Sequence, residues 1–91
     1  VKAVGWNRVV VGQGGRTLRL VYVGGIAPCY VLDHVATTLD RRAVTVTLYE
    51  GSDPAHPNAV CPEIAQLKGV DVKLPVPLGA RRVIDGATSA R

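Results

Sequence analysis

The chain carries two cysteines, Cys29 and Cys61, and two histidines, His34 and His56, whose types and spacing allow three kinds of chemistry. A redox dithiol needs its thiols close in sequence, usually as Cys-x-x-Cys, and these two are far apart. A metal site is suggested because His34 lies five residues after Cys29 and His56 lies five residues before Cys61. In a strand, however, Cys29 and His34 point to opposite faces. We therefore predict a Cys29–Cys61 disulfide and no bound metal or other cofactor.

A disulfide that closes a loop of this length stabilises a small domain by about 3.5 kcal/mol in the chain-entropy model. Structural disulfides persist mainly outside the reducing cytosol, so we expect an extracytoplasmic protein, either secreted or lipid-anchored at the cell surface. The first residues lack a basic start followed by an apolar run. We therefore expect that a targeting segment precedes Val1 in the primary product and is not part of this sequence.

For catalysis, the nearest arrangement is Asp33 beside His34, with His56 available from a later loop. Neighbouring side chains in a regular strand point apart, so we do not expect Asp33 to orient the His34 ring. A Ser/His/Asp triad would also need Ser52 or Ser89 brought in from elsewhere, and the sequence has no G-x-S-x-G elbow. We predict no catalytic residues, and a small exported hydrolase that uses His34 or His56 is the alternative.

The net charge is +4, and the arginines form two doublets, Arg41-Arg42 and Arg81-Arg82. Such a charge attracts polyanions weakly and also keeps a small domain soluble, so it identifies no partner. Nucleic-acid binding would need aromatic side chains beside the basic ones, and Tyr49 with Arg41 and Arg42 is the best set available. With one Trp and three Tyr in the whole chain, and a predicted disulfide, nucleic acid is not the expected partner.

Val, Ile and Thr make up 25 of the 91 residues, and ten Gly and six Pro interrupt them. This composition favours an all-β protein, and the length allows one domain that spans residues 1–91. The longest stretch without a charge runs from Leu20 to Leu32 and contains Gly24, Gly25 and Pro28. No transmembrane segment is therefore expected in this chain.

Apolar alternation and turn residues predict six strands and one short helix. The strands are expected over Asn7–Val11, Thr17–Val23, Tyr30–Leu39, Ala43–Glu50, Val70–Leu74 and Arg81–Ile84, and one or two helical turns over Pro62–Lys68. The first two strands should form a hairpin. The expected fold is a small antiparallel β-sandwich or partly open barrel of five to six strands, in which the helix covers an open end. Its core should contain Leu18, Leu20, Tyr22, Val44, Val46 and Leu48, with Thr45 and Thr47 on the other face.

Four features of the sequence stand out: GGRTLRLVYVGG before Cys29, VTVTL from Val44, a lone Cys61, and PLGARRVIDG from Pro77. In these features the chain resembles a group of small domains from high-GC actinobacteria. These domains are exported or lipid-anchored and all-β, and each has one cysteine pair. The resemblance covers most of the chain and implies the compartment, with no specific activity.

The segment Gly51–Asn58 is rich in turn-forming residues and has almost no apolar side chain. We expect it to be the most mobile internal segment and the contact surface, with Asp53 and His56 as binding residues. The alternative is that it is only a long connection between the fourth strand and the helix. The face that carries Arg41, Arg42 and Tyr49 is the second choice. The expected function is a non-enzymatic extracytoplasmic binding or structural module of the cell envelope, whose partner is a protein or another envelope component.

Overall fold

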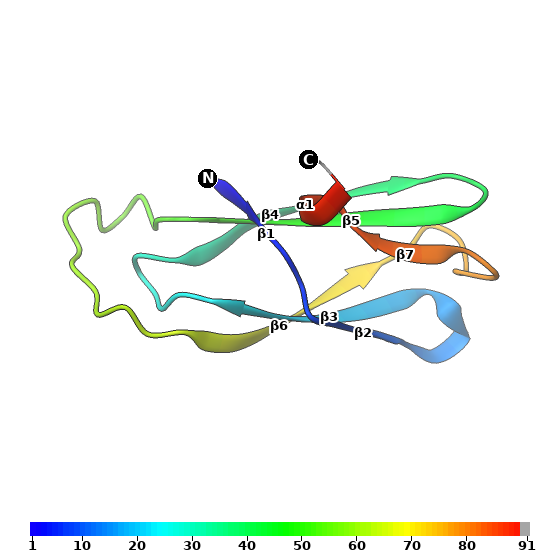
Figure 1. The fold of residues 1–91 in the computed structure, drawn as a ribbon, viewed down its shortest axis with the longest axis horizontal. Coiled ribbons are helices and arrows are strands. Elements are labelled where there is room, and N and C mark those ends of the chain that lie inside the picture. The colour runs from blue at the N-terminus through cyan, green and yellow to red at the C-terminus, as the bar shows by residue number, and fades with distance from the viewer. Residues whose placement is uncertain (90–91) are drawn as a thin grey trace.

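The computed structural model describes residues 1–89 as two β-sheets that pack face to face (Figure 1). The first sheet contains β1 (Lys2–Val4), β4 (Val31–Leu39), β5 (Ala43–Gly51) and β7 (Arg82–Asp85), and the second contains β2 (Arg8–Val11), β3 (Thr17–Gly24) and β6 (Gln66–Lys73). Two short helical turns, η1 (Gln13–Gly15) and α1 (Gly86–Ser89), complete the fold. The predicted all-β sandwich is confirmed, and the sheets do not close into a barrel. Within residues 1–89 no helix has the length and apolar character needed to span a membrane.

Strand β5 is the centre of the first sheet. It pairs antiparallel with β4 along one edge, and its other edge pairs antiparallel with β1 at Leu48–Glu50 and parallel with β7 at Ala43–Val46. The indole of Trp6 donates a hydrogen bond to the carbonyl of Val46, at the point where β1 and β7 meet. Most of β5 therefore has partners on both edges.

The predicted hairpin is present as β2 and β3, joined through η1. Gly14 and Gly15 have φ values of 71° and 70°, a region that side-chain-bearing residues rarely adopt. Gly15 also lies close to the backbone nitrogen of Leu78, which donates a hydrogen bond to the Gly15 carbonyl at 2.7 Å. These glycines allow the tight turn and let the segment before β7 pack against it.

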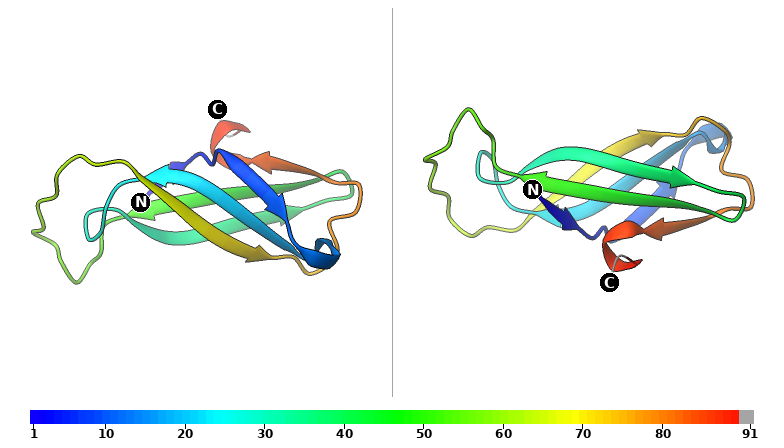
Figure 2. Two further views of the ribbon diagram at one scale, coloured as in Figure 1. Left: turned by 90° about the horizontal axis from the view of Figure 1, so that it is seen from below. Right: turned by 90° about the horizontal axis from the view of Figure 1, so that it is seen from above.

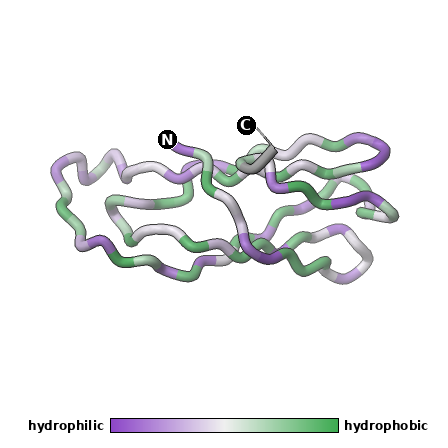
Figure 3. Tube along the Cα trace, in the orientation of Figure 1, coloured by the Kyte–Doolittle hydropathy of each residue, from purple (hydrophilic) through white to green (hydrophobic). Residues whose placement is uncertain are grey.

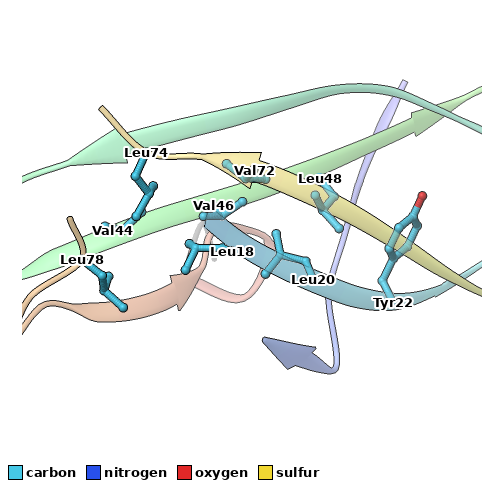
Figure 4. Packing of buried hydrophobic residues seen from close by; sticks show 9 residues of the cluster. All are labelled: Leu18, Leu20, Tyr22, Val44, Val46, Leu48, Val72, Leu74 and Leu78. Carbon is cyan, nitrogen blue, oxygen red and sulfur yellow. The ribbon is translucent and has the colours of Figure 1, made fainter. Parts of the chain in front are cut away.

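The six predicted core residues are all buried between the sheets, as Figure 4 shows for their cluster. They lie at alternate positions of β3 and β5, and Thr45 and Thr47 lie on the opposite face of β5 and are half-buried. The cluster is completed by Val72, Leu74 and Leu78 from β6 and the segment after it. Period-two alternation therefore identified the core face correctly in both strands.

The predicted helix over Pro62–Lys68 is wrong. Residues Gln66–Lys68 begin β6, which pairs with β3 from Thr17 to Gly24, and the residues before them have no regular structure. One or two isolated helical turns gain little stability, whereas the free edge of β3 offers a ladder of hydrogen bonds along its full length. The predicted strand over Val70–Leu74 is therefore the second half of a longer one.

The two strands that share one edge of β5, β1 and β7, also differ from expectation. Strand β1 was not predicted, because three residues give too short a pattern. The last strand was predicted, but its parallel pairing with β5 was not. The sequence pattern of a strand carries no information about the direction of its partner, and this strand follows a long connection that includes Pro75 and Pro77.

The molecule is elongated, with extents of 44 × 28 × 21 Å. At one end lie the connection between β3 and β4 and the long segment 52–65 between β5 and β6, and we call this the disulfide end (Figure 2). At the other end lie the turns 12–16 and 40–42 and the segment 73–82, and we call this the basic end. Figure 3 shows that hydrophilic residues concentrate in the turns, while the strands between them are largely hydrophobic.

We expect Val46→Ala to lower the free energy of unfolding by about 2 kcal/mol, because Val46 is fully buried and the sheets cannot collapse onto the space that it leaves. Urea titration followed by tryptophan fluorescence measures the change. Val10→Ala is the matched control, since Val10 is 46% exposed on the outer face of β2 and should change stability by no more than about 0.5 kcal/mol. Equal losses for the two variants would contradict the face assignment.

Candidate binding site at the disulfide end

The predicted disulfide between Cys29 and Cys61 is present, with Cα atoms 6.2 Å apart. It joins the β3–β4 connection to the segment that leads into β6. Both cysteines are used in this bond, so neither thiolate is available to a metal ion. Among residues 1–89 no group of three or more His, Cys, Asp or Glu side chains is arranged to bind a metal.

The loop 52–65 is tied to the rest of the molecule at two places. The backbone nitrogen of Asp53 donates a hydrogen bond to the carbonyl of Pro28 at 2.9 Å, and Cys61 provides the covalent link. Asp53 also organises the loop locally, because its carboxylate accepts a hydrogen bond from the nitrogen of Ala55 and lies 3.4 Å from Nδ1 of His56. The structure therefore brings the predicted binding residues Asp53 and His56 together. The predicted mobility of the loop stays a prediction.

Beneath this loop the hydrophobic core ends in an ion pair. Glu50 occupies the next core-facing position of β5 after Leu48, is 5% exposed, and accepts a hydrogen bond from Nζ of Lys68 at 2.6 Å. Lys68 lies on the core-facing side of β6 and also donates to the carbonyl of Tyr30 at 3.1 Å. The ion pair therefore connects the two sheets and the β3–β4 connection.

The surroundings of Glu50 leave little room. The nitrogen of Gly25 donates a hydrogen bond to its carboxylate at 3.4 Å, and a side chain at Gly24 would overlap the same carboxylate. Tyr22 lies on the neighbouring core position of β3, and its ring centroid is 6.0 Å from Nζ of Lys68. Burial, together with the nearby negative charge of Glu50, raises the pKa of the Tyr22 hydroxyl above 10.0.

Two cavities open on either side of Tyr30 and Glu50, which line both of them. The larger has a volume of about 420 Å³, and its other walls come from Val23, the Gly24-Gly25 pair and the segment Glu63–Ala65. The smaller has a volume of about 250 Å³ and lies toward β1, beside Cys29 and Ser52. The disulfide end is thus hollowed on both sides of one aromatic side chain.

Large apolar side chains are exposed at the disulfide end, and three of them, Val23, Tyr30 and Ile64, line the larger cavity. Val23 and Tyr30 are each 48% exposed, Ile64 is 54% exposed, and Leu67, the cross-strand partner of Val23, is 72% exposed. Val60, next to the disulfide, is 96% exposed. We call these five residues the apolar rim. Exposed apolar groups that gather at one place on a protein mark an interaction surface, whereas scattered ones do not.

The expectation that Asp33 cannot orient His34 is wrong. The pairing of β4 with β5 shifts between Leu32 and His34, so Asp33 lies in a β-bulge and its side chain is redirected. Its carboxylate lies 2.6 Å from Nδ1 of His34. The His34 ring stacks on Tyr49 with centroids 4.4 Å apart and an angle of 15° between the planes. Asp33 and His34 are exposed and Tyr49 is half-buried, and the three form a cluster on the outer face of the first sheet.

The second predicted contact surface does not form as one unit. Arg41 and Arg42 lie in the turn before β5, and Tyr49 lies near the end of that strand. Six strand positions separate Tyr49 from Ala43, which corresponds to roughly 20 Å at about 3.3 Å per residue. Tyr49 therefore belongs to the disulfide end and the two arginines to the basic end.

Comparison of the chain with models of protein families, with curated proteins and with solved structures finds no match. Sequence reasoning missed Tyr30, Glu50 and Lys68, although one signal was available. Glu50 falls in the same alternation as Val44, Val46 and Leu48, and a charged residue at a core position needs a partner.

We expect Lys68→Leu to lower the free energy of unfolding by about 3 kcal/mol, because it leaves the Glu50 carboxylate buried without a cation. The double variant Glu50→Leu/Lys68→Leu removes both charges and should recover most of that loss. Urea titrations of the wild type, the two single variants and the double variant give the coupling free energy between Glu50 and Lys68. Additive losses would show that the two side chains do not stabilise each other.

We expect the free energy of unfolding to fall as the pH rises above about 10. The folded state raises the pKa of Tyr22, so above the ordinary tyrosine pKa the unfolded chain releases this proton more readily and is favoured. Tyr22→Phe cannot ionise, so its stability should fall less between pH 9 and 11, as urea titrations at each pH would record. If the free energy of unfolding fell equally with pH for the wild type and Tyr22→Phe, the raised pKa of Tyr22 would be contradicted.

Proposed function

We propose that this protein is a non-enzymatic binding module that works outside the cytoplasm, where it contacts a protein of the cell envelope through its disulfide end. The observation that carries the proposal is that a loop fixed by a disulfide exposes apolar side chains instead of covering them. A loop that only connected two strands would gain nothing from exposing Val60 and Ile64.

The extracytoplasmic location is supported by the disulfide, which persists where thiols are not kept reduced. The resemblance to exported or lipid-anchored actinobacterial domains agrees with this location.

A protein partner is favoured over a small molecule by the shape and composition of the site. The apolar rim extends beyond the larger cavity onto Leu67 and Val60, so a ligand that filled the cavity alone would leave it uncovered. Protein interfaces combine such an apolar centre with a polar margin, and here Asp53, His56 and Glu63 would supply the margin.

To test the proposal, the immobilised protein is exposed to cell-envelope extract, and the affinity of the recovered partner is then measured for variants. Val60→Ser/Ile64→Ser and Asp53→Ala/His56→Ala should each weaken binding by about fivefold or more, as expected for residues near the centre and margin of an interface. Asp33→Ala/His34→Ala removes the other Asp–His pair, on a different face, and serves as the matched control.

Removal of the disulfide by substitution provides an independent test. With Cys29→Ser/Cys61→Ser the loop loses its covalent anchor, so the partner should bind more weakly even where the domain is still folded by circular dichroism. Full binding by this variant, or a larger loss for the Asp33/His34 control than for the loop variants, would place the contact elsewhere.

The alternative is a small exported hydrolase, and the observation that favours it is the short contact between Asp33 and His34. A carboxylate that orients an imidazole is part of nucleophilic catalysis, but the contacts found for the two histidines among the described side chains of residues 1–87 are with Asp33 and Asp53, and no hydroxyl group is among them. Hydrolysis of a panel of p-nitrophenyl esters that is lost in His34→Gln and kept in His56→Gln would support the hydrolase instead of the binding module.

A further inference from the structure

The two arginine doublets, far apart in the sequence, are adjacent in the fold. Ala43 of β5 pairs with Arg82 of β7, and the nitrogen of Arg82 donates a hydrogen bond to the carbonyl of Arg42 at 3.0 Å. Parallel pairing of the last strand with the central one therefore places Arg41-Arg42 and Arg81-Arg82 side by side. Figure 1 shows the β4–β5 turn and the start of β7 at the same end of the molecule.

Further cations lie at the same end. Arg16 follows η1 and Lys73 ends β6, and the adjacent Leu74 nitrogen donates to the Arg16 carbonyl at 2.7 Å. Together with the doublets they give six cations at the basic end, against one acidic residue, Asp40. The carboxylate of Asp40 accepts hydrogen bonds from the backbone nitrogens of Arg42 and Ala43, so it is occupied within its own turn.

Among these six cations, Arg81 interacts electrostatically with the Asp40 carboxylate, and no ion pair found within residues 1–89 involves the other five. The Arg81 guanidinium donates to the carbonyls of Asp40, Pro77 and Leu78, which fixes its position and leaves its charge in place. The salt bridges found within residues 1–89 involve other cations, such as Arg19 with Asp71 and Lys68 with Glu50. The positive charge of the chain, which looks scattered in the sequence, is thus concentrated at one end of a molecule 44 Å long.

Apolar side chains are exposed between these cations. Val11 at the end of β2 is 47% exposed, Leu39 at the end of β4 is 37% exposed, and Val76 in the segment before β7 is 38% exposed. The four aromatic residues, Trp6, Tyr22, Tyr30 and Tyr49, all lie elsewhere in the described chain. A surface made of arginines and aliphatic side chains suits the region of lipid phosphates and upper acyl chains. A single-stranded nucleic acid would need rings for base stacking.

We propose that the basic end binds the surface of membranes that contain anionic phospholipids, through contacts of its arginines with headgroup phosphates. The turns that carry them are joined by backbone hydrogen bonds into one rigid tip, which a flat membrane surface can meet without rearrangement. Lipids diffuse laterally, so several phosphates can gather under a tip of this size. Binding is electrostatic and reversible, and it leaves the disulfide end directed away from the membrane.

The test measures co-sedimentation of the whole chain with vesicles of phosphatidylglycerol and phosphatidylcholine, and with vesicles of phosphatidylcholine alone, at 50 mM and 500 mM NaCl. Wild-type protein should bind the anionic vesicles at low salt, and both neutral lipid and high salt should abolish binding. Arg41→Gln/Arg42→Gln should lower the partition coefficient about 10- to 30-fold, because each basic residue near an anionic surface contributes roughly fivefold. Adding Arg82→Gln should lower it further.

Arg8→Gln/Arg19→Gln removes the same net charge from the outer face of the second sheet and is the matched control, with an expected change of no more than about threefold. Equal losses for the two double variants would show a response to net charge alone and overturn the proposal. So would equal binding to neutral vesicles, displacement by soluble glycerol phosphate at the headgroup concentration, or tighter binding to a DNA oligonucleotide of equal phosphate content. Because none of these measurements involves the disulfide end, they are independent of the proposed protein partner.

Discussion

The contact between the inner faces of β3 and β5 determines the rest of this structure. Leu18 and Leu20 from one strand and Val44, Val46 and Leu48 from the other are completely excluded from solvent, and they hold the two sheets together along the centre of the molecule. Each of these strands has partners on both of its edges. Burial on one face of a strand fixes its register, because a slip by one residue would turn every apolar side chain outward. All the turns are therefore placed by the same contact.

Toward the disulfide end, the contact between β3 and β5 ends in polar residues, and these residues shape the surface there. The alternation of β5 continues to Glu50, so a carboxylate reaches the inner face where the apolar cluster stops. Lys68 and the amide of Gly25 satisfy it, and in doing so they position Tyr30 between two cavities. The proposed binding surface is thus built directly on the last layer of the core. Loss of the ion pair would disturb the surface as well as the stability.

Sequence reasoning identified the features that depend on local patterns. Alternation located the core faces of β3 and β5, and the glycines between Val11 and Thr17 located the hairpin. It failed where a distant partner decides the local structure. Gln66–Lys68 form a strand because the edge of β3 is available to them, and Asp33 reaches His34 because β4 contains a bulge whose position depends on its pairing with β5. The grouping of Arg41-Arg42 with Arg81-Arg82 likewise follows from a pairing between strands that are far apart in sequence.

The first and last strands, β1 and β7, cover the same edge of β5, and Trp6 donates to Val46 and to the Asp85 carboxylate where they meet. During synthesis on the ribosome the Ala43–Val46 part of this edge stays open until β7 has emerged, whereas β1 can pair with Leu48–Glu50 earlier. A nascent chain that ended before Arg82 would expose backbone donors and acceptors of the central strand to other chains. Completion of the first sheet therefore waits for β7, and a truncated product that lacked this strand would be prone to aggregation instead of forming a smaller functional domain.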